Sequence, residues 1–140
     1  MNTKELKDIL EKAKTIAIIG AKDSPGQAVN NVGRYLIDAG YEVFPVHPTR
    51  KKVWGLKAYP SLAEIPEDID IVDVFRSAEF CEDHAIEACG LTYTPMLFWL
   101  QLGIVNMKAM ELAEEKGMAA VENACLMVEH SKLFDKKPIH

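Results

Sequence analysis

Five short, predominantly apolar runs recur along the chain and are separated by longer amphipathic stretches. The runs cover residues 15–19, 42–46, 71–75, 96–100 and 118–121. Short apolar runs of this kind are typical of strands that are buried on both faces, as in a parallel sheet. In the stretches between them, apolar residues return every three or four positions, which predicts helices with one buried face.

Capping residues and glycines mark the ends of the predicted helices. Asn2 is placed to cap a first helix with Glu5 as its reciprocal partner, and Asn106 is placed to cap a helix that runs to residue 116. Further helices are predicted near residues 77–88 and 126–134. Glycine is a common helix terminator, and it follows three of the helical stretches, at Gly40, Gly90 and Gly117. Residues 47–70 are loop-rich, with one short helical turn in the motif YPSLAEIP.

This alternation of strands and helices predicts parallel strands joined by right-handed crossovers. We therefore expect a Rossmann-like, three-layer α/β/α sandwich with a five-stranded parallel sheet. With the strands numbered along the chain, the expected order is 3-2-1-4-5. A length of 140 residues fits one domain, residues 1–140, with an N-terminal helix over residues 1–14 packing on it.

Ligands of such folds bind beyond the carboxyl ends of the strands, where the strand order reverses. This rule brings four segments to one crevice: residues 20–31, 46–52, 75–76 and 100–103. The chemistry of these segments therefore decides which ligand is expected.

The composition argues against several other roles. A formal net charge of −5 is unlike that of a general nucleic-acid binder, although a local basic patch can still hold an anion. No apolar run approaches the ~18 residues of a membrane span, and the polar N-terminus lacks a secretory signal. Cys81, Cys89 and Cys125 form no CxxC or zinc pattern, which predicts reduced thiols in a cytoplasmic protein. No catalytic triad, carboxylate pair or metal-ligand cluster is recognisable, so binding is predicted rather than catalysis, with no metal.

The loop after the first strand has the features of an anion site. Gly20 carries no Cβ and lets a phosphate or an adenosine approach the backbone. The helix behind it offers free amides and a positive dipole end, and Asn30 lies near its first turn as a cap or a ligand contact. The loop does not match the dinucleotide fingerprint GxGxxG, because Lys22 and Pro25 take the places of its later glycines.

The end of the second strand is basic where a site for NAD usually carries an acid that binds the ribose. The chain here reads His47-Pro-Thr-Arg-Lys-Lys52. Pro48 offers an apolar wall for an adenine ring, and the guanidinium of Arg50 can form a bidentate contact with a phosphate. A solvated basic turn is the alternative interpretation.

Two further strand ends complete the crevice, at Phe75-Arg76 and at Leu100-Gln101-Leu102. An apolar lip with one guanidinium and one amide suits a ligand with a long amphipathic arm, although several of these apolar residues also fit a plain core. Taken together, the four segments favour an adenine nucleotide with an extra phosphate and a tail.

The motifs YPSLAEIP, DIVDVF and WLQLGI occur together here, and their combination resembles the small CoA-binding protein family, the YccU-like group of bacteria and archaea. The resemblance covers residues 16–133. That family is also similar to the CoA-binding domain of the succinyl-CoA synthetase α subunit.

The resemblance implies that coenzyme A is the ligand, and it suggests roles for individual residues. The CoA-binding loop corresponds to Lys22, Asp23 and Ser24, after Gly20 and Ala21. Arg50 takes the place of a lysine that faces a CoA phosphate, and residues 100–102 correspond to a further CoA contact. The chain departs from its relatives at Lys22, where they carry serine, and at His47, where they carry asparagine.

Cys125 follows the fifth strand, at the border of the crevice. One hypothesis places it near the thiol of CoA, where it can form a mixed disulfide under oxidation; the alternative is a small buried apolar residue. Three functions remain open. They are a CoA or acyl-CoA carrier or regulatory protein without catalysis, an NAD(P)-binding oxidoreductase in which Arg50 holds a 2′-phosphate, and an interaction module, monomer or homodimer, that uses Trp54, Tyr59 and residues 107–110.

Overall fold

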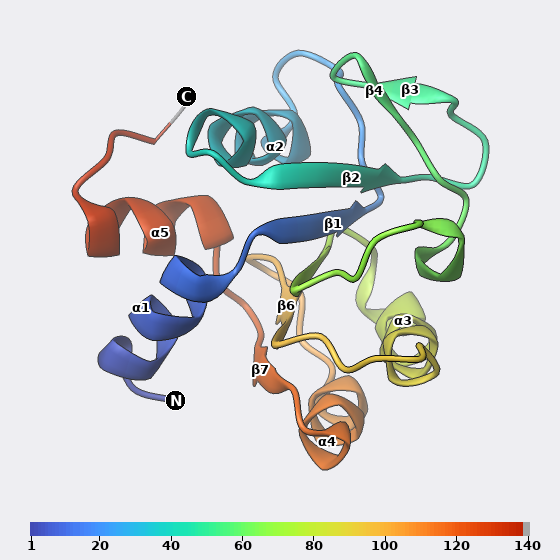
Figure 1. Ribbon diagram of the computed structural model, residues 1–140, viewed down its shortest axis with the longest axis vertical. Helices are drawn as coiled ribbons and strands as arrows, with labels where there is room; N and C mark the ends of the chain where they lie inside the picture. The colour runs from blue at the N-terminus through green and yellow to red at the C-terminus, as the bar shows by residue number, and fades with distance from the viewer. Residues whose placement is uncertain (139–140) are drawn as a thin grey trace.

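All five predicted strands form in the computed structural model, which describes residues 1–138 (Figure 1). They make one parallel sheet of β1 (Thr15–Ile19), β2 (Glu42–Val46), β5 (Ile71–Val74), β6 (Leu97–Leu100) and β7 (Ala119–Val121). The Rossmann-like α/β class predicted from the apolar runs is thereby confirmed. Within the described residues, every helix is too short or too polar to span a lipid bilayer.

Helices cover both faces of the sheet (Figure 1). One face carries α1 (Thr3–Lys12), α2 (Ala28–Asp38) and α5 (Leu126–Phe134), and the other carries α3 (Ala78–Cys89) and α4 (Met107–Lys116). The two predicted side-chain caps are confirmed. The Oδ1 atom of Asn2 accepts from the amide of Glu5 at 2.8 Å, and that of Asn106 accepts from the amide of Ala109 at 2.9 Å.

The strand order is β2-β1-β5-β6-β7, so the predicted order 3-2-1-4-5 was wrong. Counted along the chain the order is 2-1-3-4-5, which places β2 at an edge. Pro45 explains this position, because proline has no amide hydrogen to give to a neighbouring strand. Its carbonyl accepts from the amide of Tyr59 on the outer side of β2, at 2.9 Å, and its nitrogen points the same way. The missing donor therefore faces the edge, away from β1.

This order moves the reversal point of the sheet to the gap between β1 and β5. The chain comes very close to itself there. The amide of Phe75 donates to the carbonyl of Ile19 at 2.9 Å, and a Cβ on Gly20 would lie 2.3 Å from the carbonyl oxygen of Phe75. Gly20 also has a φ of +83°, a conformation that favours glycine. Both constraints require glycine at this position.

An unpredicted hairpin occupies part of the loop-rich region, with β3 (Lys52–Val53) paired to β4 (Leu56–Lys57). It lies at the end of the molecule to which the arrowheads of β1 and β2 point (Figure 1). Trp54 at its tip packs on α2 at Gly33, where a Cβ would come within 2.2 Å of the indole ring. The short helical turn predicted in YPSLAEIP is confirmed as a 3-10 turn, η1 (Leu62–Glu64).

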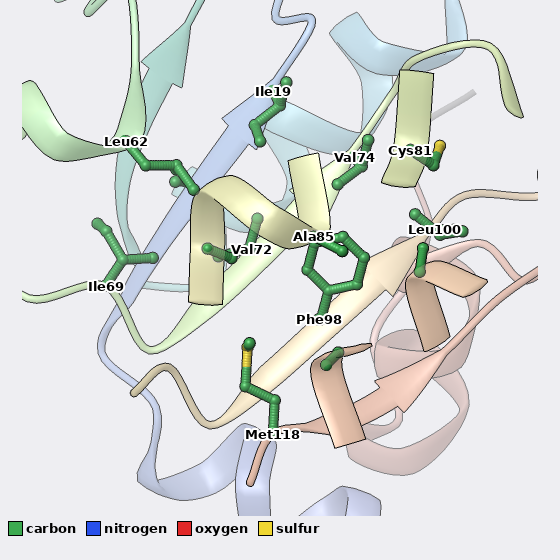
Figure 2. Close-up of a cluster of buried hydrophobic side chains, with 14 of the residues drawn as sticks. Ile19, Leu62, Ile69, Val72, Val74, Cys81, Ala85, Phe98, Leu100 and Met118 are labelled. Atoms are coloured by element: carbon green, nitrogen blue, oxygen red, sulfur yellow. The ribbon is translucent and has the colours of Figure 1, made fainter. Parts of the chain in front are cut away.

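The sheet separates two apolar cores. Figure 2 shows the core under α3 and α4, where Phe98 and Leu100 of β6 lie among Val72, Val74 and Ala85. The core on the other face contains a buried carboxyl group. Asp73 of β5 is fully buried beside Ile18 and Trp99 in the register, and neither of its carboxyl oxygens has a hydrogen-bond partner among the described residues.

Candidate ligand-binding cleft

A cleft of about 740 Å³ opens beyond the carboxyl ends of the strands. Its walls come from the loops that follow β2, β1, β5 and β6, and from the starts of α2, α3 and α5. The cleft is lined by Gly20, Lys22, Gln27, Ala28, Val29, His47, Pro48, Phe75, Arg76, Ser77, Gln101, Leu102, Ile104 and Cys125. Its position is the one that the fold predicts for a ligand.

Most of the residues selected from the sequence meet in this cleft. They are Gly20, Lys22, His47, Pro48, Phe75, Arg76, Gln101, Leu102 and Cys125. Ala21 and Leu100 are fully buried and belong to the two cores. Ser24 belongs to the turn before α2, in which its carbonyl accepts from the amide of Gln27 at 3.3 Å.

The other three selected residues hold the loop after β1 against the hairpin. Asp23 accepts from the guanidinium of Arg50 through Oδ1 and from the amide of Trp54 through Oδ2, each at 3.2 Å. The indole Nε1 of Trp54 donates to Oδ1 of the buried Asn30 at 2.9 Å. Arg50 therefore points to Asp23 rather than into the cleft. The Oδ1 atom of Asn30 bonds to the indole of Trp54 rather than to a backbone amide at the start of α2. Together these contacts pre-organise the loop over residues 20–27.

The start of α2 forms one wall of the cleft with Gln27, Ala28 and Val29, which the sequence analysis did not select as site residues. Gln27 takes the N-cap position without a side-chain hydrogen bond, and the first turn contains no acidic residue. The first amides of a helix lack partners within the helix, so those of Ala28 and Val29 are available at the edge of the cleft. Free amides at the positive end of a helix form an anion-binding site.

His47 lies in a cationic environment at the β2 side of the cleft. Burial lowers its pKa below the usual 6.5, and the nearby charges of Arg50, Lys22 and Arg76 lower it further, so the ring is neutral at neutral pH. Its Nδ1 atom accepts from the amides of Thr49 and Arg50 at 3.2 and 3.1 Å. This assigns the proton to Nε2 and lets the imidazole cap the turn as an asparagine side chain does.

The other end of the cleft is held together by amide side chains. Gln101 is buried, and its Oε1 accepts from the amide of Leu126 at the start of α5, at 3.2 Å. Asn123 accepts from the amide of Gly103 at 2.8 Å. These bonds join the loop after β6 to the loop after β7 and bring half-buried Cys125 to the cleft.

The lining changes character across the sheet. The cationic and imidazole side chains lie at one end, where His47 follows β2, Lys22 follows β1 and Arg76 follows β5. The loop after β6 contributes the apolar side chains of Leu102 and Ile104. No carboxylate lines the cleft in the described part of the chain. Five strands spaced ~4.8 Å apart span roughly 19 Å. The cleft therefore has the length for an extended amphipathic ligand, with a cationic end and an apolar end.

Comparisons with known proteins agree with this geometry. Residues 14–131 match the model of the CoA binding domain family. The chain is 40% identical over 127 residues to the uncharacterized protein YneT of Bacillus subtilis, covering 91% of this chain and 93% of that protein. A solved structure of Thermus thermophilus, that of cell-free ID.343, is 41% identical with a TM-score of 0.89, covering 96% of this chain and all of that one.

A larger enzyme contains a similar region. Acetate–CoA ligase (ADP-forming) I of Archaeoglobus fulgidus is 26% identical over 122 residues, which are 81% of this chain and 18% of that enzyme. The match to the family model covers the strands, the cleft loops and most of the helices, and the sequence motifs had indicated the same group. The chain therefore belongs to the CoA binding domain family.

Proposed function

We propose that the cleft binds coenzyme A or an acyl-CoA, and that the chain acts as a carrier or regulatory binding protein without a reaction of its own. The observation that carries this proposal is the change in lining across one continuous cleft. Free amides and cations lie at one end, and apolar side chains and a thiol lie at the other. Coenzyme A has the matching chemistry, with a phosphorylated adenosine at one end and a thiol at the other.

The cationic end supplies three kinds of contact to phosphates. The start of α2 offers backbone amides, Lys22 and Arg76 offer charge, and His47 offers a neutral Nε2–H donor. Pro48 adds an apolar wall beside them for the adenine ring. NAD usually binds with an acid on the ribose. The chain after β2 carries His47 and a basic run in place of this acid, which favours CoA over NAD.

A panel of ligands tests this function directly. We expect CoA and acetyl-CoA to raise the midpoint of thermal unfolding strongly, and NADPH and ATP to raise it little. A ligand at ~100 times its dissociation constant adds about 2.7 kcal/mol to the free energy of unfolding. Calorimetry without heat of binding for CoA would contradict the proposal, and tighter binding of NADPH than of CoA would favour the oxidoreductase.

Arg50 is proposed to leave Asp23 and grip a CoA phosphate when the ligand binds. Arg50→Ala is then expected to weaken CoA about tenfold more than dephospho-CoA, since a charge-assisted bidentate contact contributes roughly 1.5 kcal/mol or more. Asp23→Asn is the matched control, because it breaks the same ion pair and retains the guanidinium. If both variants weaken the two ligands equally, Arg50 acts only by holding the loop.

Cys125 is proposed to form a mixed disulfide with the thiol of CoA under oxidation. The two thiols lose two protons and two electrons to diamide, which is reduced to its hydrazine. Mass spectrometry of protein treated with CoA and diamide is expected to find the adduct on Cys125, with loss in Cys125→Ser and retention in Cys89→Ser. Cys89 is a suitable control because it packs between α3 and α4, where its Sγ contacts the carbonyl of Leu112. An unmodified Cys125 refutes the disulfide.

A further inference from the structure

We infer that the apolar end of the cleft accepts an uncharged, apolar acyl chain, so that the protein prefers medium-chain acyl thioesters of CoA to acetyl-CoA and CoA. The inference rests on the proposed function and specifies the ligand class of the same cleft.

Four exposed apolar side chains belong to the segments that border this end of the cleft. We call this set the apolar rim; its members, with their exposed fractions, are Phe80 (40%), Leu102 (69%), Val105 (54%) and Met107 (76%). They come from the start of α3, from the loop after β6 and from the first position of α4. The Nδ2 atom of Asn106 donates to the carbonyl of Ala78 at 2.9 Å, which holds the starts of α3 and α4 together.

The apolar rim is continuous with the cleft. Leu102 is part of both, and Ile104 lines the cleft from the same loop. On the facing side, Arg76 lines the cleft and carries its guanidinium 4.4 Å from the ring centroid of Phe80. A chain that leaves the cleft past Leu102 therefore meets the rim next.

The chemistry of the rim selects the acyl group. Single exposed apolar residues are common on protein surfaces, whereas several on adjoining segments beside a cleft indicate a binding surface. With the phosphates held at the start of α2, the thiol end of CoA reaches the side of Cys125 and Leu102. Residues 100–107 carry no charge, and Arg76 beside them is stacked over the ring of Phe80, so a charged acyl group would lose hydration there for little compensation.

Calorimetric titration with CoA, acetyl-CoA, succinyl-CoA and octanoyl-CoA tests the inference. Octanoyl-CoA is expected to bind about tenfold tighter than acetyl-CoA, and succinyl-CoA no tighter than CoA. A fully buried methylene contributes about fourfold in affinity, so tenfold requires the burial of roughly two of the added methylenes. Equal affinity for the octanoyl and acetyl thioesters overturns the inference.

Variants separate the rim from the rest of the cleft. Val105→Ser with Met107→Ser changes rim residues that do not line the cleft, and it is expected to reduce the preference for octanoyl-CoA about fivefold at unchanged affinity for CoA. Ile86→Ser is the control, because Ile86 is also 54% exposed but lies outside the rim, later in α3. An unchanged preference in the double variant overturns the inference.

Other outcomes also decide between the two proposals. If CoA binds but chain length has no effect, the rim inference fails and the proposed function stands. If CoA and all its thioesters fail to bind, both fail. If sedimentation shows a dimer that the double variant dissociates, and chain length has no effect, the rim is an interface between two copies and the inference is overturned.

Discussion

Gly20→Ala is expected to lower the free energy of unfolding by about 2 to 4 kcal/mol and to abolish binding of CoA. A side chain at a φ of +83° costs about 1 to 2 kcal/mol by itself. The added methyl would also lie 2.3 Å from the carbonyl oxygen of Phe75. This carbonyl cannot easily withdraw, because the amide of Phe75 donates to Ile19 in the sheet at 2.9 Å. Relief of the overlap would separate the loops that follow β1 and β5, and both loops line the cleft.

Gly26→Ala is the matched control for this change. Gly26 has nearly the same φ, +84°, but a Cβ built on it meets no atom within 4 Å. It is therefore expected to show only the cost of the backbone conformation. Urea unfolding measures both free energies, with titration of CoA for binding. If the two variants lose equal stability, the close approach of Gly20 to Phe75 has been misjudged.

Asp73→Asn is expected to stabilise the protein at pH 8 and to change its stability little at pH 4. Burial raises the pKa of Asp73 well above its ordinary value near 4. Above pH 4 the unfolded chain releases this proton while the folded protein keeps it, so stability falls as the pH rises until the pH passes the folded pKa. Asparagine cannot ionise, and its variant lacks this loss. A gain of at least about 1.4 kcal/mol at pH 8 is expected, because a pKa raised by one pH unit corresponds to that difference in free energy.

The titration of His130 does not disturb the comparison of wild type with Asp73→Asn. Burial, with the charge of Lys136, lowers the pKa of His130 to about 4. This destabilises the folded state as the pH falls from about 6.5 to 4, but equally in wild type and variant. Asp70→Asn, in contrast, is expected to destabilise, because Asp70 accepts from the amides of Lys14 and Thr15 at 2.7 and 3.3 Å. Urea unfolding between pH 4 and pH 8 gives the free energies, and equal pH dependence in wild type and Asp73→Asn would show that Asp73 ionises in the fold.

Local patterns in the sequence were sufficient to identify the elements. A strand that is buried on both faces must be apolar wherever it pairs, and a capped helix end needs only a few adjacent residues. Asn2 and Asn106 were therefore assigned correctly from sequence alone. The general position of the cleft also followed, because both doubly wound orders place ligands at the carboxyl ends of the strands.

Strand order and side-chain partners depend on contacts between segments that are far apart in the sequence. The predicted order put Pro45 in an interior strand, whereas the fold places its missing donor at the edge of the sheet. Arg50 was expected to face the ligand from its position in a basic run, but its partner is Asp23, 27 residues away. The β3–β4 hairpin likewise depends on the packing of Trp54 against Gly33 of α2.

Dihedral preference and the period of apolar residues act over a few positions, so they appear in any short stretch of this chain. Packing over the whole chain decides which strands are neighbours, which cations line the cleft and why Asp73 lacks a partner within residues 1–138. Many different arrangements of the elements satisfy the same local sequence pattern, so the pattern cannot select among them. The cleft combines both levels: its glycine, its helix start and its cations can be recognised one by one, but their meeting at one end of the sheet follows from the assembled fold.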